Sequence, residues 1–416
     1  MVSRFHDLVR AVKKASYILM NATAEQKNTF LEVLAGRLGE ESGNILIENK
    51  RDLTAARMEG MKVSLTDRLV LDEKRIQAMV DGLRNVALLP DPIGEIVSGV
   101  TRPNGLIIER IRVPLGVIAI IYEARPNVTI DSVALGVKAG NALVLRGSHS
   151  ARHSNRVLAD LSRRCLGETG LPENAVLLIE SESHQDVQEL LSLRDCIDVA
   201  IPRGGAGLIQ SVIEHSHIPV IETGVGNCHV YIEASADFPM AEAILINAKT
   251  QRPSVCNAAE TLLVDEAIAQ GFLPPLAEAL GARGVELRGC EKTMAILPQA
   301  KPASEEDWWC EFLDLILSVK IVSGINEAIS HIHHYGSRHS EAIVTSDYRQ
   351  ARRFLAEVDA AAVYVNASTR FTDGEQFGLG AEIGISTQKL HARGPMGLRE
   401  LTTTKYIVYG NGQIRQ

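Results

Sequence analysis

The sequence predicts an α/β protein with two domains, each built on a parallel β-sheet, and a small additional β arm. Two observations carry this prediction. A chain of 416 residues with 45% hydrophobic side chains is long enough to bury at least two cores. From residue 113 onward, short apolar runs alternate with helical stretches, and such runs are typical of strands that helices cover on both faces.

The first hundred residues favour helices. Thr23 and Gln26 have the spacing of a capping box, and apolar residues follow at helical spacing, namely Phe30, Leu34 and Leu38. A second helix is expected from Asp72, because an apolar stripe follows it and Pro90 then prevents continuation.

The apolar runs after residue 113 divide into two groups, which we expect to form two sheets. The first group comprises residues 117–122, 142–145, 176–179, 197–201 and 230–232. The second begins after residue 237 and comprises residues 261–264, 316–322, 342–345 and 362–366. Two further strand-like segments, Leu106–Val113 and Tyr406–Tyr409, fit neither group, and we interpret them as a projecting arm.

Composition limits the classes of partner. The formal charge of −8 gives no broad positive field for nucleic acid or an anionic membrane surface. We expect neither a signal segment at the N-terminus nor a run that spans a bilayer, because charged residues interrupt the apolar stretches. The six cysteines form no Cys-x-x-Cys pair, which predicts a protein of the reducing cytoplasm. We expect its partner to be a small-molecule substrate.

Cys256 is the first candidate for catalysis. It lies in the polar segment 251–258, directly before the predicted strand 261–264. A thiolate is a strong nucleophile, but an ordinary thiol is mostly protonated at neutral pH, so a nearby cation such as Arg252 or Lys249 would be needed. The alternative is a small buried hydrophobic residue, which is the commoner fate of a lone cysteine.

Asn127 is the second candidate. It follows the predicted strand 117–122 in the segment Tyr122–Thr129, and ligands collect at the carboxyl ends of such strands. Its amide could donate to an oxyanion, as a tetrahedral intermediate requires. An ordinary asparagine in a polar turn is the alternative.

Two further segments could bind phosphate. Arg146 directly follows the predicted strand 142–145, and Gly204 and Gly205 form a turn before a helix. The spacing of these glycines is not that of the dinucleotide fingerprint, so a plain chain reversal is the alternative. A cluster of four histidines, His331, His333, His334 and His339, lacks a completing set of ligands, so we expect no metal there and interpret the cluster as a solvated surface.

Together and in order, these segments resemble the aldehyde dehydrogenase superfamily, and specifically its γ-glutamyl phosphate reductase branch. The matching motifs are residues 122–129, 202–207, 247–254, 364–374, 378–382 and 391–398. The resemblance implies an aldehyde-dehydrogenase-like fold of three parts. These are a nucleotide-binding domain (1–100 and 114–236, with a return through 371–397), a catalytic domain (237–370) and an oligomerisation arm (101–113 and 398–416).

The resemblance also implies roles for single residues. Cys256 falls at the nucleophile position and Asn127 at the oxyanion donor, while Arg146 falls where relatives place a lysine beside the adenosine ribose. Glu311 and Phe312 resemble a pair that positions the nicotinamide ribose and ring. We expect NADPH as the cofactor, because His149 replaces the glutamate with which relatives that prefer NAD often repel a 2′-phosphate. The candidates for binding the substrate are Arg125, Arg252 and Arg370.

The implied activity is the reduction of an acyl phosphate to an aldehyde through a thioester on Cys256, without a metal. A homo-oligomer is expected, and a transient complex with the glutamate 5-kinase that makes the substrate is plausible. Two residues depart from the pattern. Glu375 replaces a glycine of the branch, and Glu222 lies where hydrolytic relatives keep a water-activating base, so an NAD-linked hydrolytic dehydrogenase is the alternative.

Overall fold

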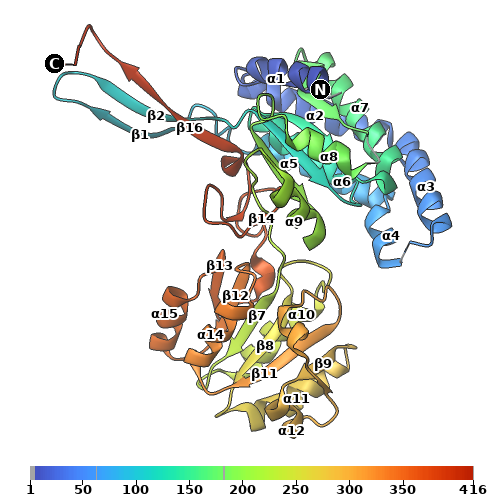
Figure 1. Cartoon of the computed structure of the whole chain (residues 1–416), viewed down its shortest axis with the longest axis vertical. Helices are drawn as coiled ribbons and strands as arrows, with labels where there is room; N and C mark the ends of the chain where they lie inside the picture. The colour runs from blue at the N-terminus through green and yellow to red at the C-terminus, as the bar shows by residue number, and fades with distance from the viewer. Residues whose placement is uncertain (1–4, 62, 181–182, 416) are drawn as a thin grey trace. The chain divides into compact units, whose positions relative to one another are not determined.

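The computed structural model describes residues 5–61, 63–180 and 183–415, and the chain forms two compact units (Figure 1). The first unit comprises Met1–Thr223, Gly378–Gly384 and Met396–Gln416, and the second comprises Gly224–Phe377 and Ile385–Pro395. Among the described residues, no helix has both the length and the apolar character needed to cross a membrane.

The first unit begins with a layer of helices, as predicted. These are α1 (His6–Leu19), α2 (Ala24–Glu40), α3 (Ser42–Met58), α4 (Val63–Leu69) and α5 (Glu73–Leu88). Thr23 and Gln26 form the expected capping box at the start of α2, and the Asp72 carboxylate accepts the Arg75 amide at the start of α5. Both helix starts that the sequence predicted are therefore confirmed.

A parallel sheet of order β5-β4-β3-β6 forms the centre of the first unit. Its strands are β3 (Val117–Tyr122), β4 (Ala142–Arg146), β5 (Val176–Leu178) and β6 (Val199–Arg203). Every residue of β3 is buried, which explains why this strand is continuously apolar. The connecting helices are α6 (Asn127–Lys138), α7 (Arg152–Glu168), α8 (His184–Leu191) and α9 (Ala206–His215).

The arm is an antiparallel sheet that extends from the helical body of the first unit (Figure 1). Its order is β1-β2-β16, with β1 (Ile96–Thr101), β2 (Ile107–Pro114) and β16 (Thr402–Tyr409). The predicted arm is present, but the sequence missed β1, because residues 96–100 were assigned to the nucleotide-binding domain and only Thr101 to the arm. All six residues of β1 are exposed, so this strand carries no burial pattern that sequence could reveal.

The second unit contains a seven-stranded parallel sheet of order β10-β9-β11-β8-β7-β12-β13. Its strands are β7 (Cys228–Ile232), β8 (Ala259–Asp265), β9 (Glu286–Gly289), β10 (Lys301–Pro302), β11 (Ile316–Val322), β12 (Ser340–Val344) and β13 (Ala362–Val365). Its helices are α10 (Phe238–Thr250), α11 (Ala269–Gly281), α12 (Glu291–Ile296), α13 (Glu305–Trp309), α14 (Ile325–Tyr335) and α15 (Tyr348–Glu357). A core of aliphatic side chains from β7, β8 and β11 packs against α10 and α11.

The boundary between the units differs from the predicted one. Strand β7 pairs with β8 and β12, so the run 230–232 belongs to the second sheet and not the first. The units therefore divide after Thr223 rather than at residue 236. The returning segment 371–397 is also split, because residues 371–377 and the short strand pair β14 (Ile385–Ser386) and β15 (Gly394–Pro395) belong to the second unit.

Candidate active site

Cys256 lies in the loop before β8, half-buried, and its backbone is held from one side by the chain that enters β7. The Cys228 thiol donates to the Cys256 carbonyl oxygen over 3.2 Å. A Cβ atom at Gly226 would overlap the same carbonyl group, so only glycine allows the two backbones to lie this close. The loop that carries the candidate nucleophile is therefore fixed in place.

A second segment holds the other side of this loop through Asn257. The Thr369 hydroxyl donates to the Asn257 carbonyl oxygen over 2.7 Å. The Asn257 side-chain amide donates to the carbonyl oxygens of Thr372 (2.9 Å) and Arg370 (3.3 Å). The 3₁₀ turn η3 (Thr369–Phe371) is thereby anchored beside the nucleophile, and it brings Arg370 there.

Arg370 interacts electrostatically with Cys256, and Arg252 interacts with Arg370. The Arg370 Nε donates to the Gln251 side-chain oxygen over 2.8 Å. Burial lowers the pKa of Arg370, the negative charge of Cys256 acts in the opposite sense, and the positive charge of Arg252 lowers it further. A thiolate at Cys256 is therefore stabilised by Arg370.

Lys249 does not serve as this cation. Its ammonium group is fully buried and forms an ion pair of 2.6 Å with the Glu260 carboxylate, which is fully buried too. Burial raises the pKa of Glu260 to about 7, against the effect of the lysine. Lys249 therefore does not activate the thiol. It has a structural role, in which the Lys249 ammonium and the Glu260 carboxylate each compensate the burial of the other.

The neighbouring cysteine is unsuited to catalysis. Cys228 is completely buried, and burial raises its pKa well above the ordinary value. Burial likewise raises the pKa of Cys165 in the first unit to about 11. These two thiols stay protonated at neutral pH, and they behave as the small hydrophobic residues that a lone cysteine usually is.

Glu311 is connected to the same loop. Its carboxylate accepts the amide of Gly226 over 2.8 Å, and Gly226 packs against Cys256. The Phe312 ring lies 5.1 Å from the guanidinium carbon of Arg288. Leu313 follows with a positive φ of 54°, and its amide donates to Glu260 over 3.2 Å. The role of Glu311 and Phe312 toward a nicotinamide ribose and ring stays a prediction.

The interpretation of the histidine cluster as a solvated surface is wrong for two of its members. His331 and His339 are buried, with exposed fractions of 3% and 0%, whereas His333 and His334 are exposed. The aromatic rings of Trp308 and Tyr335 cover His331. The sequence did not reveal this because α14 buries one face, and His331 falls on it beside Ile332.

Asn127 begins α6 in the first unit, directly after β3. Its side-chain amide donates to the Asp131 carboxylate, one turn along the same helix, over 2.8 Å. Burial raises the pKa of Asp131 to about 6, although Asn127 and Arg203 both counteract this. An amide nitrogen carries two hydrogens, so Asp131 can orient Asn127 while the second N–H serves another acceptor.

A cavity of about 620 Å³ lies at the carboxyl ends of β4 and β5 in the first unit. The residues that line it include Gly147, Ser148, His149, Arg152, His153, Arg156, Glu180 and Asp186. Arg146, named from the sequence, lies one residue before this lining. Burial lowers the pKa of Arg146, and its Nε has no hydrogen-bond partner among the described residues.

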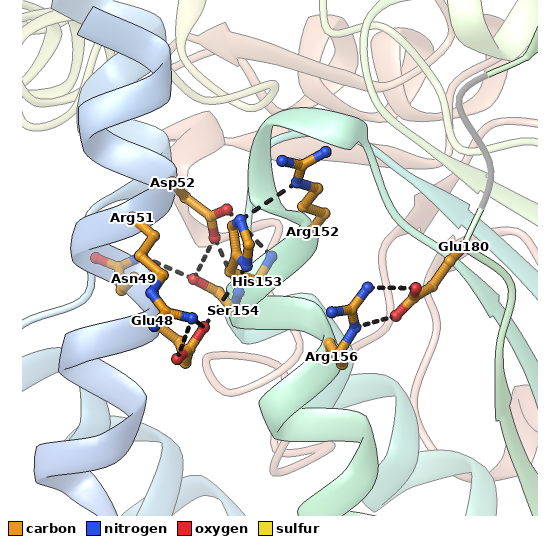
Figure 2. A network of polar contacts seen from close by, with 9 residues as sticks. All are labelled: Glu48, Asn49, Arg51, Asp52, Arg152, His153, Ser154, Arg156 and Glu180. Atoms are coloured by element: carbon orange, nitrogen blue, oxygen red, sulfur yellow. Dashed lines mark hydrogen bonds and ion pairs between the residues drawn. The ribbon is translucent and has the colours of Figure 1, made fainter.

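The cationic side chains of this cavity stand on the first turns of α7, and α3 holds that helix end (Figure 2). The buried Asp52 carboxylate accepts the amides of His153 (3.1 Å) and Ser154 (2.8 Å). Arg156 forms an ion pair with Glu180. The sequence interpretation missed Arg152 and Arg156, although their spacing of four residues after a strand end was a usable signal.

The glycine turn at Gly204 and Gly205 approaches a carboxylate. The Gly205 amide donates to Glu123 over 2.9 Å, and a Cβ at Gly204 would meet the same carboxylate. The close approach of Glu123 and Leu208 thus favours glycine at 204, whereas Gly205 has room for a Cβ, and the role of both glycines toward phosphate stays a prediction. Nearby, Glu222 is half-buried and precedes Thr223, whose hydroxyl donates to the Pro202 carbonyl oxygen over 2.6 Å.

Glu375 does not disturb the loop in which it replaces a glycine. It is exposed, and it is not among the residues with positive φ, so its conformation is open to any side chain. The Asp373 carboxylate accepts the amides of Glu375 and Gln376 and shapes the turn. The turn is therefore stable with glutamate at this position.

The first unit has a polar cavity at the carboxyl ends of its parallel strands, and the second unit holds an anchored, half-buried cysteine. The model of the aldehyde dehydrogenase family matches residues 34–306. The γ-glutamyl phosphate reductase of Carboxydothermus hydrogenoformans is 59% identical over 409 residues, with 98% of this chain and 99% of the relative covered. That of Moorella thermoacetica is 58% identical over 404 residues, with 97% of each chain covered.

A crystal structure of γ-glutamyl phosphate reductase from Thermotoga maritima superimposes with a TM-score of 0.96 at 50% identity and covers 99% of each chain. The chain therefore belongs to the aldehyde dehydrogenase family, in its γ-glutamyl phosphate reductase branch, and is an oxidoreductase. The resemblance found from the sequence motifs and the fold class that it implied are both confirmed.

Proposed function

We propose that this enzyme reduces L-glutamyl 5-phosphate to L-glutamate 5-semialdehyde and phosphate in proline biosynthesis, with NADPH as reductant and a thioester on Cys256. The observation that carries the proposal is the anchored, half-buried Cys256 with Arg370 beside it. It stands in a chain that is 58–59% identical to γ-glutamyl phosphate reductases over almost its full length.

The reaction begins at the thiol. The Cys256 sulfur attacks the acyl carbon, the bond from that carbon to the phosphate oxygen breaks, and phosphate leaves with the bonding electrons. NADPH, when bound, supplies the hydride that the thioester carbon accepts. The resulting thiohemiacetal at Cys256 then releases the aldehyde and regenerates the thiolate. Asn127 remains our candidate donor to the oxyanion, oriented by Asp131.

The cavity at the ends of β4 and β5 suits the adenosine end of NADPH. Arg152 and His149 contribute positive or protonatable groups to its lining, and Arg146 precedes it with an unpartnered Nε. Cations favour a 2′-phosphate, which NADH lacks. We therefore propose NADPH as the preferred cofactor, with a higher kcat/KM than NADH.

The arm supports self-association. Both outer strands, β1 and β16, have edges without a strand partner among the described residues. Apolar and aromatic side chains on them are exposed, including Ile96, Val100, Tyr406 and Tyr409. Such edges pair readily with a second copy, so we propose a homo-oligomer joined through the arm. We also propose a transient complex with a glutamate 5-kinase, because the substrate is labile. We propose a cytoplasmic location, because the cysteines are free.

The decisive experiment changes Cys256 and varies phosphate. Cys256→Ser should lower the rate of reduction by more than about a thousandfold, because a serine without a base cannot supply the anion. NADPH binding should stay intact. In the reverse direction, semialdehyde and NADP should turn over only when phosphate is present. A single burst that restarts on adding phosphate is the expected result.

The same assay tests the alternative. A hydrolytic dehydrogenase with Glu222 as base would convert semialdehyde to free glutamate steadily in phosphate-free buffer. That outcome would replace the reductase proposal, and equal or better kcat/KM with NADH would replace the cofactor assignment.

A further inference from the structure

Arg370 differs from an ordinary surface arginine because its backbone is fixed to the neighbour of the nucleophile. The Asn257 amide donates to its carbonyl oxygen, and Thr369 donates back to the Asn257 carbonyl oxygen. The Asn257 side-chain amide also donates to the carbonyl oxygen of Thr372, just after the same turn. The position of residue 370 relative to Cys256 is therefore determined by three hydrogen bonds on adjacent residues.

The Arg370 side chain is half-buried, and part of it is already oriented. Its Nε donates to Gln251, which leaves the two Nη groups as a planar fork. Within residues 5–61, 63–180 and 183–415, no carboxylate forms an ion pair with Arg370. Asp373 acts on Arg370 electrostatically, but its Oδ1 accepts the amides of Glu375 and Gln376.

Arg252 adds a second positive charge at the same place. It is exposed, lies four residues before Cys256, and acts on Arg370 as a like charge. Two cations held near one another repel unless an anion lies between them. A planar guanidinium fork matches the geometry of phosphate oxygens, and Arg252 can follow the anion because it is exposed.

We propose that Arg370, assisted by Arg252, binds the phosphate group of the acyl phosphate, and inorganic phosphate in the reverse reaction. This inference rests on the proposed function and adds the residues that hold the leaving group. Arg370 and Arg252 were predicted only as general candidates for the substrate, with its α-amino and α-carboxylate groups in view.

The phosphate fits Arg370 better than the α-carboxylate of the substrate does. The leaving group is attached to the carbon that Cys256 attacks, whereas the α-carboxylate lies at the far end of the substrate's carbon chain. Residues 369 and 370 are hydrogen-bonded to Asn257, the residue next to Cys256, which brings Arg370 close to that reacting carbon. Arg370 is thus placed where negative charge develops on the departing phosphate.

The step needs no proton from the enzyme. The sulfur–carbon bond forms, the carbon–oxygen bond breaks, and the phosphate departs with the electron pair as a stable anion that Arg370 neutralises. In reverse, a phosphate oxygen attacks the thioester carbon and the Cys256 thiolate leaves. Arg370 stabilises the anion on both sides of this exchange.

The first test follows the alkylation of Cys256 by iodoacetamide, with the modified peptide identified by mass spectrometry. Inorganic phosphate should slow alkylation of the wild-type enzyme and have no effect on Arg370→Met. Chloride at matched ionic strength should protect neither protein. Arg349→Met, an exposed arginine at the start of α15 in the same unit, is the matched control and should behave as wild type.

The second test measures the reverse reaction. Arg370→Met should raise the KM for phosphate at least about tenfold, the scale of a lost hydrogen bond to a charged group, with little change in the KM for semialdehyde. Arg370→Lys should recover part of the loss, because it restores the charge but not the fork. Unaltered NADPH binding shows that the variants are folded.

Three outcomes would overturn the inference. Equal phosphate protection of wild type and Arg370→Met would place the phosphate elsewhere. If Arg370→Met lost only the protection that glutamate gives against alkylation, or showed a raised KM for semialdehyde, Arg370 would be assigned to the α-carboxylate. Protection by chloride would reduce the effect to charge screening. If phosphate protects the wild type from alkylation as expected, but the enzyme shows no phosphate-dependent turnover, the anion site stands and the proposed reaction fails.

Discussion

Gly226 offers a sharp test of the packing around the nucleophile. A Cβ atom built on it lies 2.6 Å from the Cys256 Cα and closer still to its carbonyl carbon and oxygen. Carbon atoms in ordinary contact are about 3.5–4.0 Å apart, so Gly226→Ala must push the two backbones apart by more than about an ångström. The Gly226 amide also donates to Glu311, so the same displacement reaches that carboxylate.

The magnitude follows from this displacement. A shift of about 1 Å in a reacting group can cost about a hundredfold in rate, and overpacking typically costs about 1–3 kcal/mol of stability. We expect Gly226→Ala to lower kcat/KM about a hundredfold or more and to change the alkylation rate of Cys256. The reverse reaction with semialdehyde, NADP and phosphate measures the first effect, and thermal unfolding measures the loss of stability.

Gly281→Ala is the matched control in the same unit. Gly281 ends α11, and a Cβ there meets no atom within 4 Å. Alanine should leave kcat/KM unchanged and can raise stability slightly, because it restricts the unfolded chain. If folded Gly226→Ala retained kcat/KM within about threefold of the wild type, the rigid contact between residues 226 and 256 would not govern the nucleophile.

Two further predictions concern the arm and the buried histidine. Deleting residues 405–416 removes most of β16 and should convert the oligomer to monomers, whereas a full-length protein that light scattering finds monomeric at micromolar concentration would disprove the arm interface. Burial lowers the pKa of His339 to about 4, below its ordinary value near 6.5, so the folded state resists protonation. Above about pH 6.5, the protonation of His339 does not lower the free energy of unfolding. As the pH falls to 4, up to about 3 kcal/mol of this free energy is lost. His339→Asn should flatten this slope in urea titrations, and an unchanged slope would show that other groups cause it.

Local signals predicted much of the fold. The strands at 117–122 and 316–322 have the predicted bounds. The first is buried along its whole length and is therefore a continuous apolar run. The capping residues Thr23 and Asp72 fixed two helix starts. Strand β7 was assigned to the wrong sheet because an apolar run reads the same whichever neighbours it pairs with.

The chemistry of the site was less accessible from sequence. Cys256 was recognised through its motif, but the partners that fix it are distant in the chain, such as Thr369, which lies 112 residues from Asn257. Lys249 stands only seven residues before Cys256, yet burial directs it to Glu260. Spacing along a sequence reports neighbours on one element, and it carries no information about contacts that form only after the sheet has assembled.

The arm also has a consequence for how the chain acquires its structure. Arg112 of β2 and Thr402 of β16 are hydrogen-bonded although 290 residues separate them. During translation, β2 is made before the second unit, whereas its partner β16 is made after that unit. Pairings of such high sequence separation form slowly, and the nascent chain carries one open edge of β2 throughout synthesis of the second unit. β1 pairs with the opposite edge of β2, so the edge that faces β16 stays open until β16 has been made.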